Sequence, residues 1–301
     1  MSFNDVTIGQ DGRFYIGSYR HASVLVLNED RELENVWCEG VRNTQRQIKA
    51  HPDGRILLLQ DNGLHFYSPD GEHEKYISLS DPDAGFFPEY SGLGVSNDGR
   101  LQIGLERGEG LVKLDEDCQV LEHWPDEDFA APVMVAVDDA DMTYAVSFGL
   151  GESWIDIRDR DGSLVEERYI EAPLPDALPA SVTDLSDGGV ALLWIVSEDP
   201  PDPDPQSRIV EDFVVQYFSA DGELIQEWYA SDSGAPELLG APRGMATEDD
   251  GIIHIVDQGV GPDRMRMHSF SADGEFLDEW RLERDEVLCD YNDRVAWMVD
   301  C

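Results

Sequence analysis

Arginine supplies most of the positive charge of this chain, and its placement is the clearest sign of binding chemistry. The 301 residues contain 21 Lys and Arg against 64 Asp and Glu, and only three of the cations are lysines. Seven of the 21 cations map to the face of the expected fold that carries its long loops: Arg20, Arg42, Arg46, Arg107, Arg208, Arg243 and Arg264. A planar guanidinium can hold a carboxylate or phosphate through two hydrogen bonds. The placement predicts capture of an anionic group, with pairing to neighbouring Asp and Glu side chains as the alternative.

Sequence signatures of catalysis are missing. The chain has seven histidines but no His-x-x-x-His pair, no Gly-x-Ser-x-Gly elbow and no Walker phosphate loop. Its four cysteines show no Cys-x-x-Cys spacing: Cys38, Cys118, Cys289 and Cys301. We expect free structural thiols, with a Cys289–Cys301 bridge as the alternative. We therefore expect no catalytic residue, no bound metal and no cofactor.

Six copies of one two-hairpin pattern form the scaffold that must position these residues. The first hairpin of each copy joins two apolar runs through a tight turn, at 6–16, 48–58, 93–103, 135–144, 182–192 and 245–255. Five of these turns contain Asp-Gly, which accepts the positive φ of a hairpin turn. In four copies a Trp follows the Asp of the second turn by seven residues: Trp37, Trp124, Trp228 and Trp280. Repetition at this period predicts a propeller or a solenoid.

The repeats predict an all-β fold, a six-bladed β-propeller of four-stranded antiparallel blades. The approximate blades are 2–38, 44–80, 91–125, 132–170, 181–230 and 243–281, with inner strands near 4–8, 45–49, 92–96, 133–137, 181–185 and 243–247. Because each blade packs on its neighbours, residues 1–281 should form one domain. Residues 282–301 do not fit the repeat. Their apolar spacing favours a short helical tail packed on the propeller, with an extra strand at 295–299 as the alternative.

A strand that ends in Phe-Ser-x-Asp-Gly, as at 218–222 and 270–274, resembles NHL-type repeats. Such repeats build six-bladed propellers related in shape to the TolB-like and regucalcin/gluconolactonase groups, and the resemblance covers residues 2–281. Related lactonase and esterase propellers hold a channel metal with a Glu, an Asn and an Asp on inner strands. At the matching positions of this chain only Asn4 and Asp184 could ligate. Calcium takes about six to eight oxygen ligands, so the resemblance implies the propeller shape more strongly than the hydrolase activity.

The topology of a four-stranded blade places the Asp-Gly turns on one face and all the long connections on the other. The long connections are 81–90, 171–179, 198–208 and 231–242. Long loops at one end of a rigid scaffold commonly carry binding sites, although the Pro-Asp run at 198–208 could also be a solvated insertion. The candidate binding residues on this long-loop face are Arg20, Arg42, Arg46, Asp61, Asn62, Tyr90, Arg107, Arg243 and Asp257. We expect Arg46 and Arg243 to point toward the mouth of the channel.

The net charge of −43 is the second strong feature of the sequence. Abundant carboxylates with almost no lysine resemble the proteins of salt-accumulating halophiles, and a merely acidic protein is the alternative. The charge argues against nucleic acid and against an anionic membrane as partners. The sequence has no apolar stretch long enough to span a membrane and does not open like a secretory signal, so we expect a cytoplasmic protein.

These observations predict a non-catalytic binding or scaffolding propeller. It would use the long-loop face to bind a protein or a small anionic ligand. The alternative is a metal-dependent lactonase-like or esterase-like hydrolase with its site in the channel.

Overall fold

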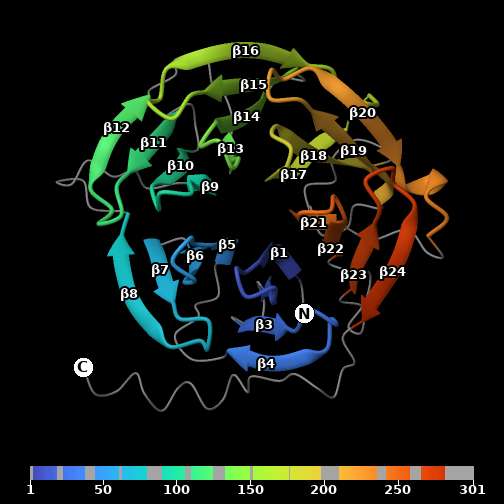
Figure 1. The fold of residues 1–301 in the computed structure, drawn as a ribbon. Coiled ribbons are helices and arrows are strands. Elements are labelled where there is room, and N and C mark those ends of the chain that lie inside the picture. Colours follow the sequence, from blue (N-terminus) through green and yellow to red (C-terminus); the bar gives the residue numbers. More distant parts are fainter. Residues whose placement is uncertain are drawn as a thin grey trace.

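The protein is a ring of six four-stranded antiparallel sheets around a central channel, as the repeats predict (Figure 1). The computed structural model describes residues 3–18, 23–37, 45–60, 63–79, 90–105, 110–124, 133–149, 152–175, 177–197, 210–235, 242–257 and 266–281. The segment 282–301, with its expected helix, lies outside the described residues, as do Cys38, Cys289 and Cys301. Within these ranges no helix has the length and apolar character needed to cross a membrane.

The strands follow one another outward from the channel in every blade. Blade 1 comprises β1 (Phe3–Ile8), β2 (Phe14–Ser18), β3 (Ser23–Leu27) and β4 (Leu33–Trp37); blade 2 comprises β5 (Gln45–Ala50), β6 (Ile56–Gln60), β7 (Gly63–Tyr67) and β8 (His73–Ser78). Blade 3 comprises β9 (Tyr90–Val95), β10 (Leu101–Leu105), β11 (Leu111–Leu114) and β12 (Val120–Trp124); blade 4 comprises β13 (Val133–Val137), β14 (Thr143–Gly149), β15 (Glu152–Arg158) and β16 (Leu164–Ile170). Blade 5 comprises β17 (Leu178–Asp184), β18 (Val190–Ser197), β19 (Val210–Phe218) and β20 (Leu224–Tyr229), followed by the short 3₁₀ helix η2 (Ala230–Asp232); blade 6 comprises β21 (Pro242–Thr247), β22 (Ile253–Asp257), β23 (Arg266–Phe270) and β24 (Phe276–Arg281).

The inner strands β1, β5, β9, β13, β17 and β21 surround the channel, and each contacts the next around the ring. The predicted inner strands are confirmed to within three residues. Each sheet contains only consecutive strands, so among the described residues blades 1 and 6 share no strand. Side chains join these two blades instead: the rings of Phe14 and His254 meet edge to face at 4.8 Å, and Arg31 donates from Nη1 to Ser269 Oγ at 2.8 Å. The ring is closed at this junction by packing and hydrogen bonds.

The hydrophobic core lies between adjacent blades. Every residue of the middle strands β2, β3, β6 and β7 is buried, because each blade is covered on both faces by its neighbours. The largest apolar cluster joins blades 4 and 5, with Ile155 on one side and Trp194 on the other. Burial of apolar area at about 25 cal/mol per Å² is the main force that holds blade to blade. The outer strands expose most of their residues, as β12 and β16 show.

The repeated tryptophans occupy one equivalent position of the outer strand, as the spacing predicts. Each pairs with the same position of the preceding strand: Trp37 with Val24, Trp124 with Leu111, Trp228 with Val215 and Trp280 with Met267. The corresponding residues of blades 2 and 4 are Ile77 and Arg168. Three of the indoles lie against the second-hairpin turn of the next blade, so the repeat spacing marks a contact between blades.

Cys118 agrees with the expectation of structural thiols. It is free and buried in the second turn of blade 3, where Ile77 of blade 2 packs against the same cluster. Burial raises the pKa of its thiol to about 11, which disfavours the reactive thiolate.

Candidate functional site

The long-loop face is the end of the ring that carries the connections between the second and third strands of each blade and the connections from one blade to the next. Five of the predicted binding residues lie outside the described residues: Arg20, Arg42, Asp61, Asn62 and Arg107. Arg46 lies in β5 and Tyr90 begins β9, both at the long-loop end of inner strands, and the structure describes their backbone only. The structure describes the side chains of Arg243 and Asp257.

Arg243 and Asp257 lie together at the long-loop end of blade 6. Arg243 is half-buried and follows Pro242, the pairing partner of Asp257. Asp257 is fully buried, and its Oδ2 lies 3.3 Å from Nη2 of Arg266, which is only 3% exposed. Arg266 also lies 3.6 Å from Glu279 through Nη1 and Oε2. Because a buried guanidinium needs a compensating charge, Asp257 and Glu279 neutralise Arg266, a residue that the sequence did not single out.

A second candidate site occupies the opposite end of the channel, on the turn face that the first-hairpin turns form. There the structure has a cavity of about 180 Å³. Its lining comes from the last residues of all six inner strands and from the turns that follow β9 and β13. The polar members are Thr7, Lys49, Asn97, Asp138, Asp139, Thr183, Asp184 and Thr247. The candidate binding residues expected from the sequence all belong to the long-loop end. Of the residues in this cavity, only Asp184 had been considered, as a possible metal ligand. Lys49 was nevertheless visible as the only lysine in any inner strand.

The two charges on inner strands in this cavity come from opposite sides of the ring. Lys49 lies in β5 of blade 2 and Asp184 ends β17 of blade 5, three blades away in a ring of six (Figure 1). In the described part of the chain Lys49 makes no direct ion pair. Asp184 is exposed to solvent, yet many protein atoms surround its carboxyl group. The resulting loss of hydration raises the carboxyl pKa. Lys49 acts in the opposite direction, whereas Asp139 and Asp138 raise the pKa further.

Asp5 is a third charged residue of the inner strands, next to the cavity. It is 3% exposed, and its Oδ2 accepts a hydrogen bond from the backbone N–H of Ile48 at 3.1 Å. Burial raises its carboxyl pKa to about 6, against the lowering effect of Lys49 and of the backbone N–H groups. The hydrogen bond of Asp5 therefore links blades 1 and 2. The positive charge of Lys49 lowers the pKa values of both Asp5 and Asp184.

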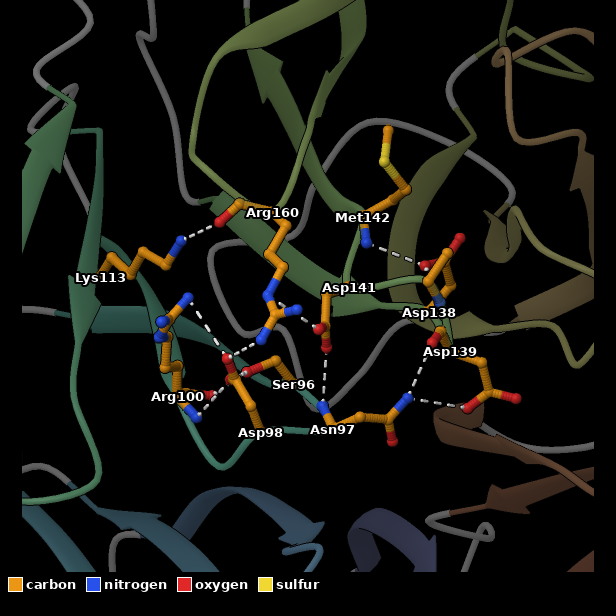
Figure 2. Close-up of polar contacts among 11 residues, drawn as sticks. Ser96, Asn97, Asp98, Arg100, Lys113, Asp138, Asp139, Asp141, Met142 and Arg160 are labelled. Carbon is orange, nitrogen blue, oxygen red and sulfur yellow. Dashed lines mark hydrogen bonds and ion pairs between the residues drawn. The ribbon is translucent and has the colours of Figure 1, made fainter.

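A polar network between blades 3 and 4 positions the cavity residue Asn97 (Figure 2). Its backbone N–H donates to Asp141 Oδ1 at 2.9 Å, and its Nδ2 donates to the carbonyl oxygen of Asp139 at 2.9 Å. Arg160 then joins the two blades, since Nη2 lies 2.8 Å from Asp98 Oδ2 and Nε lies 3.4 Å from Asp141 Oδ2. Figure 2 shows Asn97, Asp98, Asp141 and Arg160 close together between the turns of the two blades.

The two carboxylates of blade 4 at the cavity have different roles. Asp138 is buried, and it accepts hydrogen bonds from the backbone N–H groups of Ala140 and Met142 and from the hydroxyl of Tyr144, each at 2.9 Å. These contacts engage both of its oxygens in the turn. Asp139 is exposed, and its Oδ1 has one long contact of 3.4 Å with Asn97. Asp139 and Asp184 are therefore the carboxylates that can reach a ligand.

No protein-family model and no curated protein matches the sequence. Solved structures match its shape. A virginiamycin B lyase from Staphylococcus aureus is 12% identical with a TM-score of 0.60, over 93% of this chain and 84% of that one. A calcium-binding protein, regucalcin, from Agrobacterium tumefaciens is 13% identical with a TM-score of 0.60, over 85% and 81%. A proposed gluconolactonase is 11% identical with a TM-score of 0.62, over 92% and 90%.

At these identities the likeness shows the fold alone. It confirms the expected relation in shape to regucalcin and gluconolactonase propellers, whereas the NHL-type resemblance stays a prediction. The chain is a six-bladed β-propeller with structural neighbours among the regucalcin, gluconolactonase and virginiamycin B lyase propellers.

Proposed function

We propose that this propeller is a non-catalytic binding module that holds the anionic groups of a protein or small-molecule partner at the long-loop end of its channel. One observation carries the proposal. The six inner strands contain three cations, Arg46, Lys49 and Arg243, and two carboxylates, Asp5 and Asp184. In the whole chain the ratio is 21 cations to 64 carboxylates. The strands around the channel therefore reverse the charge balance of the protein.

The reversal favours an anion because the rest of the surface repels one. An anionic group near the channel meets strands that contain one more cation than carboxylates. Two of the three cations, Arg46 and Arg243, belong to the long-loop ends of β5 and β21. Arginine suits this role because its guanidinium binds carboxylate and phosphate through two hydrogen bonds. The long connections of the same face would supply the remaining contacts of a protein partner.

The test is isothermal titration with inorganic phosphate and citrate as probes. Arg46→Gln and Arg243→Gln together should weaken binding by roughly 10- to 100-fold, the worth of one or two charge-assisted hydrogen bonds. Arg55→Gln is the matched control, because Arg55 lies on the turn face and pairs with Asp53 at 2.6 Å. Equal binding by the double variant and the wild type would refute the proposal.

The hydrolase alternative requires a metal in the channel, and the described residues do not fit one. No group of three or more His, Cys, Asp and Glu side chains in the described ranges could hold a metal ion. Asp5 is buried and bonded to a backbone amide, and the ammonium of Lys49 acts on both Asp5 and Asp184. A positive charge at that place opposes a divalent cation. Elemental analysis of the purified protein tests the point, since one tightly held divalent ion per chain would favour the hydrolase.

A further inference from the structure

We propose that the cavity at the turn end of the channel binds a small zwitterion, a molecule of amino-acid size with one ammonium and one carboxylate group. This cavity lies at the end of the channel opposite the long-loop face. Its ligand contacts come from residues other than Arg46 and Arg243, and it does not depend on the function proposed above.

Opposite charges are separated across the cavity. Lys49 and Asp184 line the same cavity from blades 2 and 5, on opposite sides of the ring. Each feels the other, because Lys49 lowers the pKa of Asp184, yet they form no direct ion pair in the described part of the chain. A ligand between them can place its carboxylate toward Lys49 and its ammonium toward Asp184.

The charged groups that line each side of the cavity have one sign. Asp139 and Asp184, from adjacent blades 4 and 5, form the negative side, and Asp139 raises the pKa of Asp184 as a neighbouring like charge does. A bound ammonium would relieve that repulsion. On the other side Asp5 is bonded to the Ile48 N–H, so the ammonium of Lys49 is the group left to meet a ligand carboxylate.

Threonine hydroxyls supply the hydrogen bonds that such a ligand needs. Thr7 Oγ1 accepts from the backbone N–H of Ala50 at 3.1 Å, so its own proton is available to donate. Thr183 is buried and lines the same cavity. The Oγ1 of Thr247 is inaccessible to solvent and has no hydrogen-bond partner within the described ranges. Because solvent does not reach this atom, Thr7 and Thr183 are the threonines of the cavity whose hydroxyls remain for a ligand.

The size of the cavity limits the ligand. Its 180 Å³ is slightly more than the roughly 150 Å³ of an engineered apolar cavity that takes up benzene in another protein. A molecule of about six to nine non-hydrogen atoms therefore fits. Ions with a single charge fit the cavity less well, because a simple anion meets Asp139 and Asp184 and a simple cation meets Lys49.

The test is calorimetric titration with glycine, L-alanine, L-proline and glycine betaine, and with acetate and ethylammonium as single-charge probes. The KCl concentration is the lowest at which circular dichroism shows the folded protein, because salt screens these charges. At least one zwitterion should bind, and both single-charge probes should bind about 10-fold more weakly or not at all. If no zwitterion binds below about 10 mM, the proposal is wrong.

Two variants separate recognition from damage to the fold. Asp184→Asn should weaken the zwitterion by roughly 10- to 100-fold and strengthen acetate, because Lys49 remains and the opposing charge is gone. Lys49→Met should weaken the zwitterion and strengthen ethylammonium. Asp187→Asn, in the turn after β17, and Lys75→Met, in β8, are matched controls that should change neither ligand. A variant that merely unfolds cannot bind either single-charge probe more tightly. If Asp184→Asn does not strengthen acetate binding and Lys49→Met does not strengthen ethylammonium binding, the proposal is overturned, even if both variants lose the zwitterion.

Discussion

Trp37 of blade 1 packs against Gly71 in the second turn of blade 2. A Cβ atom built on Gly71 would come within 2.5 Å of the indole Cδ1, and the glycine has a φ of 89°. The same relationship joins Trp124 to Gly162 and Trp228 to Gly274. The turn glycine of one blade thus makes room for the tryptophan of the preceding blade, and the two repeated positions form one interface.

This interface predicts a large loss of stability on truncation. Trp37 and Trp228 are 4% and 7% exposed, so their replacement by Ala should lower the free energy of unfolding by about 3–5 kcal/mol each. Trp124 and Trp280 are half-buried and should cost less. Gly71→Ala should also destabilise, by at least about 1–2 kcal/mol, because of its left-handed backbone and the displaced ring. Urea unfolding checks all of these, and losses below about 1 kcal/mol at both Trp37 and Trp228 would show that they are surface aromatics.

The first turn of blade 4 has Asp141 where the other five copies have Gly, and its φ is 60°. Its carboxylate compensates for this backbone by accepting the Asn97 N–H and by contacting Arg160. Asp141→Asn keeps an acceptor and a residue that tolerates this conformation, so it should cost less than about 1 kcal/mol. Asp141→Ala loses the hydrogen-bond acceptor and the tolerance for this conformation, so it should lower the free energy of unfolding by roughly 2–3 kcal/mol. Chemical unfolding of both variants tests this, and equal losses would contradict the role given to the side chain.

Asp5 should make stability depend on pH. Its carboxyl pKa is about 6 in the folded protein against 3.8 for the free group. The folded state therefore holds the proton more tightly, and this contribution is complete below about pH 4 and is lost as the pH rises through 6. Two pKa units correspond to about 3 kcal/mol. As the pH rises from 4 to about 7 the wild type loses this contribution, whereas an Asn side chain does not ionise. The Asp5→Asn variant should therefore gain about 3 kcal/mol of stability relative to the wild type over that range.

The comparison with the variant is necessary because several other carboxylates have lowered pKa values and act in the opposite sense, among them Asp53 beside Arg55. Lys49→Met should raise the Asp5 midpoint further, since Lys49 lowers that pKa. NMR titration of the carboxyl group measures the Asp5 midpoint in the wild type and in the Lys49→Met variant. A stability difference that does not change with pH would contradict the assignment.

Salt should stabilise the protein if its charge is a halophilic adaptation. The melting temperature should rise between low salt and about 2 M KCl, because the screening length falls to a few Å and carboxylate repulsion weakens. Replacement of a block of exposed Asp by Asn, for example Asp187, Asp221 and Asp249, should reproduce part of that gain at low salt. A constant melting temperature across this range would end the halophile interpretation.

The blades could be predicted from the sequence because they depend on contacts that are close along the chain. Asp-Gly turns set tight hairpins, hairpins set the register of adjacent strands, and the apolar runs specify which strands are buried. The four tryptophans share one position in the outer strand for the same reason, since each lies a constant distance after its turn. The missing glycine of the fourth turn was also visible, but not the contact with Asn97 that replaces its function.

Contacts between individual charged and polar side chains of different blades could not be predicted, because ring closure decides them and no local spacing encodes them. Asp257 was singled out as a ligand contact, and only the fold shows it buried against Arg266. Lys49 and Asp184 are far apart in the sequence and carry no motif, yet the sixfold ring sets them on opposite sides of one cavity. The sequence determined the number and order of the blades through short-range turn chemistry and apolar repeats. Only the tertiary structure decided which charges share the channel, because that depends on how far each blade is rotated about the common axis.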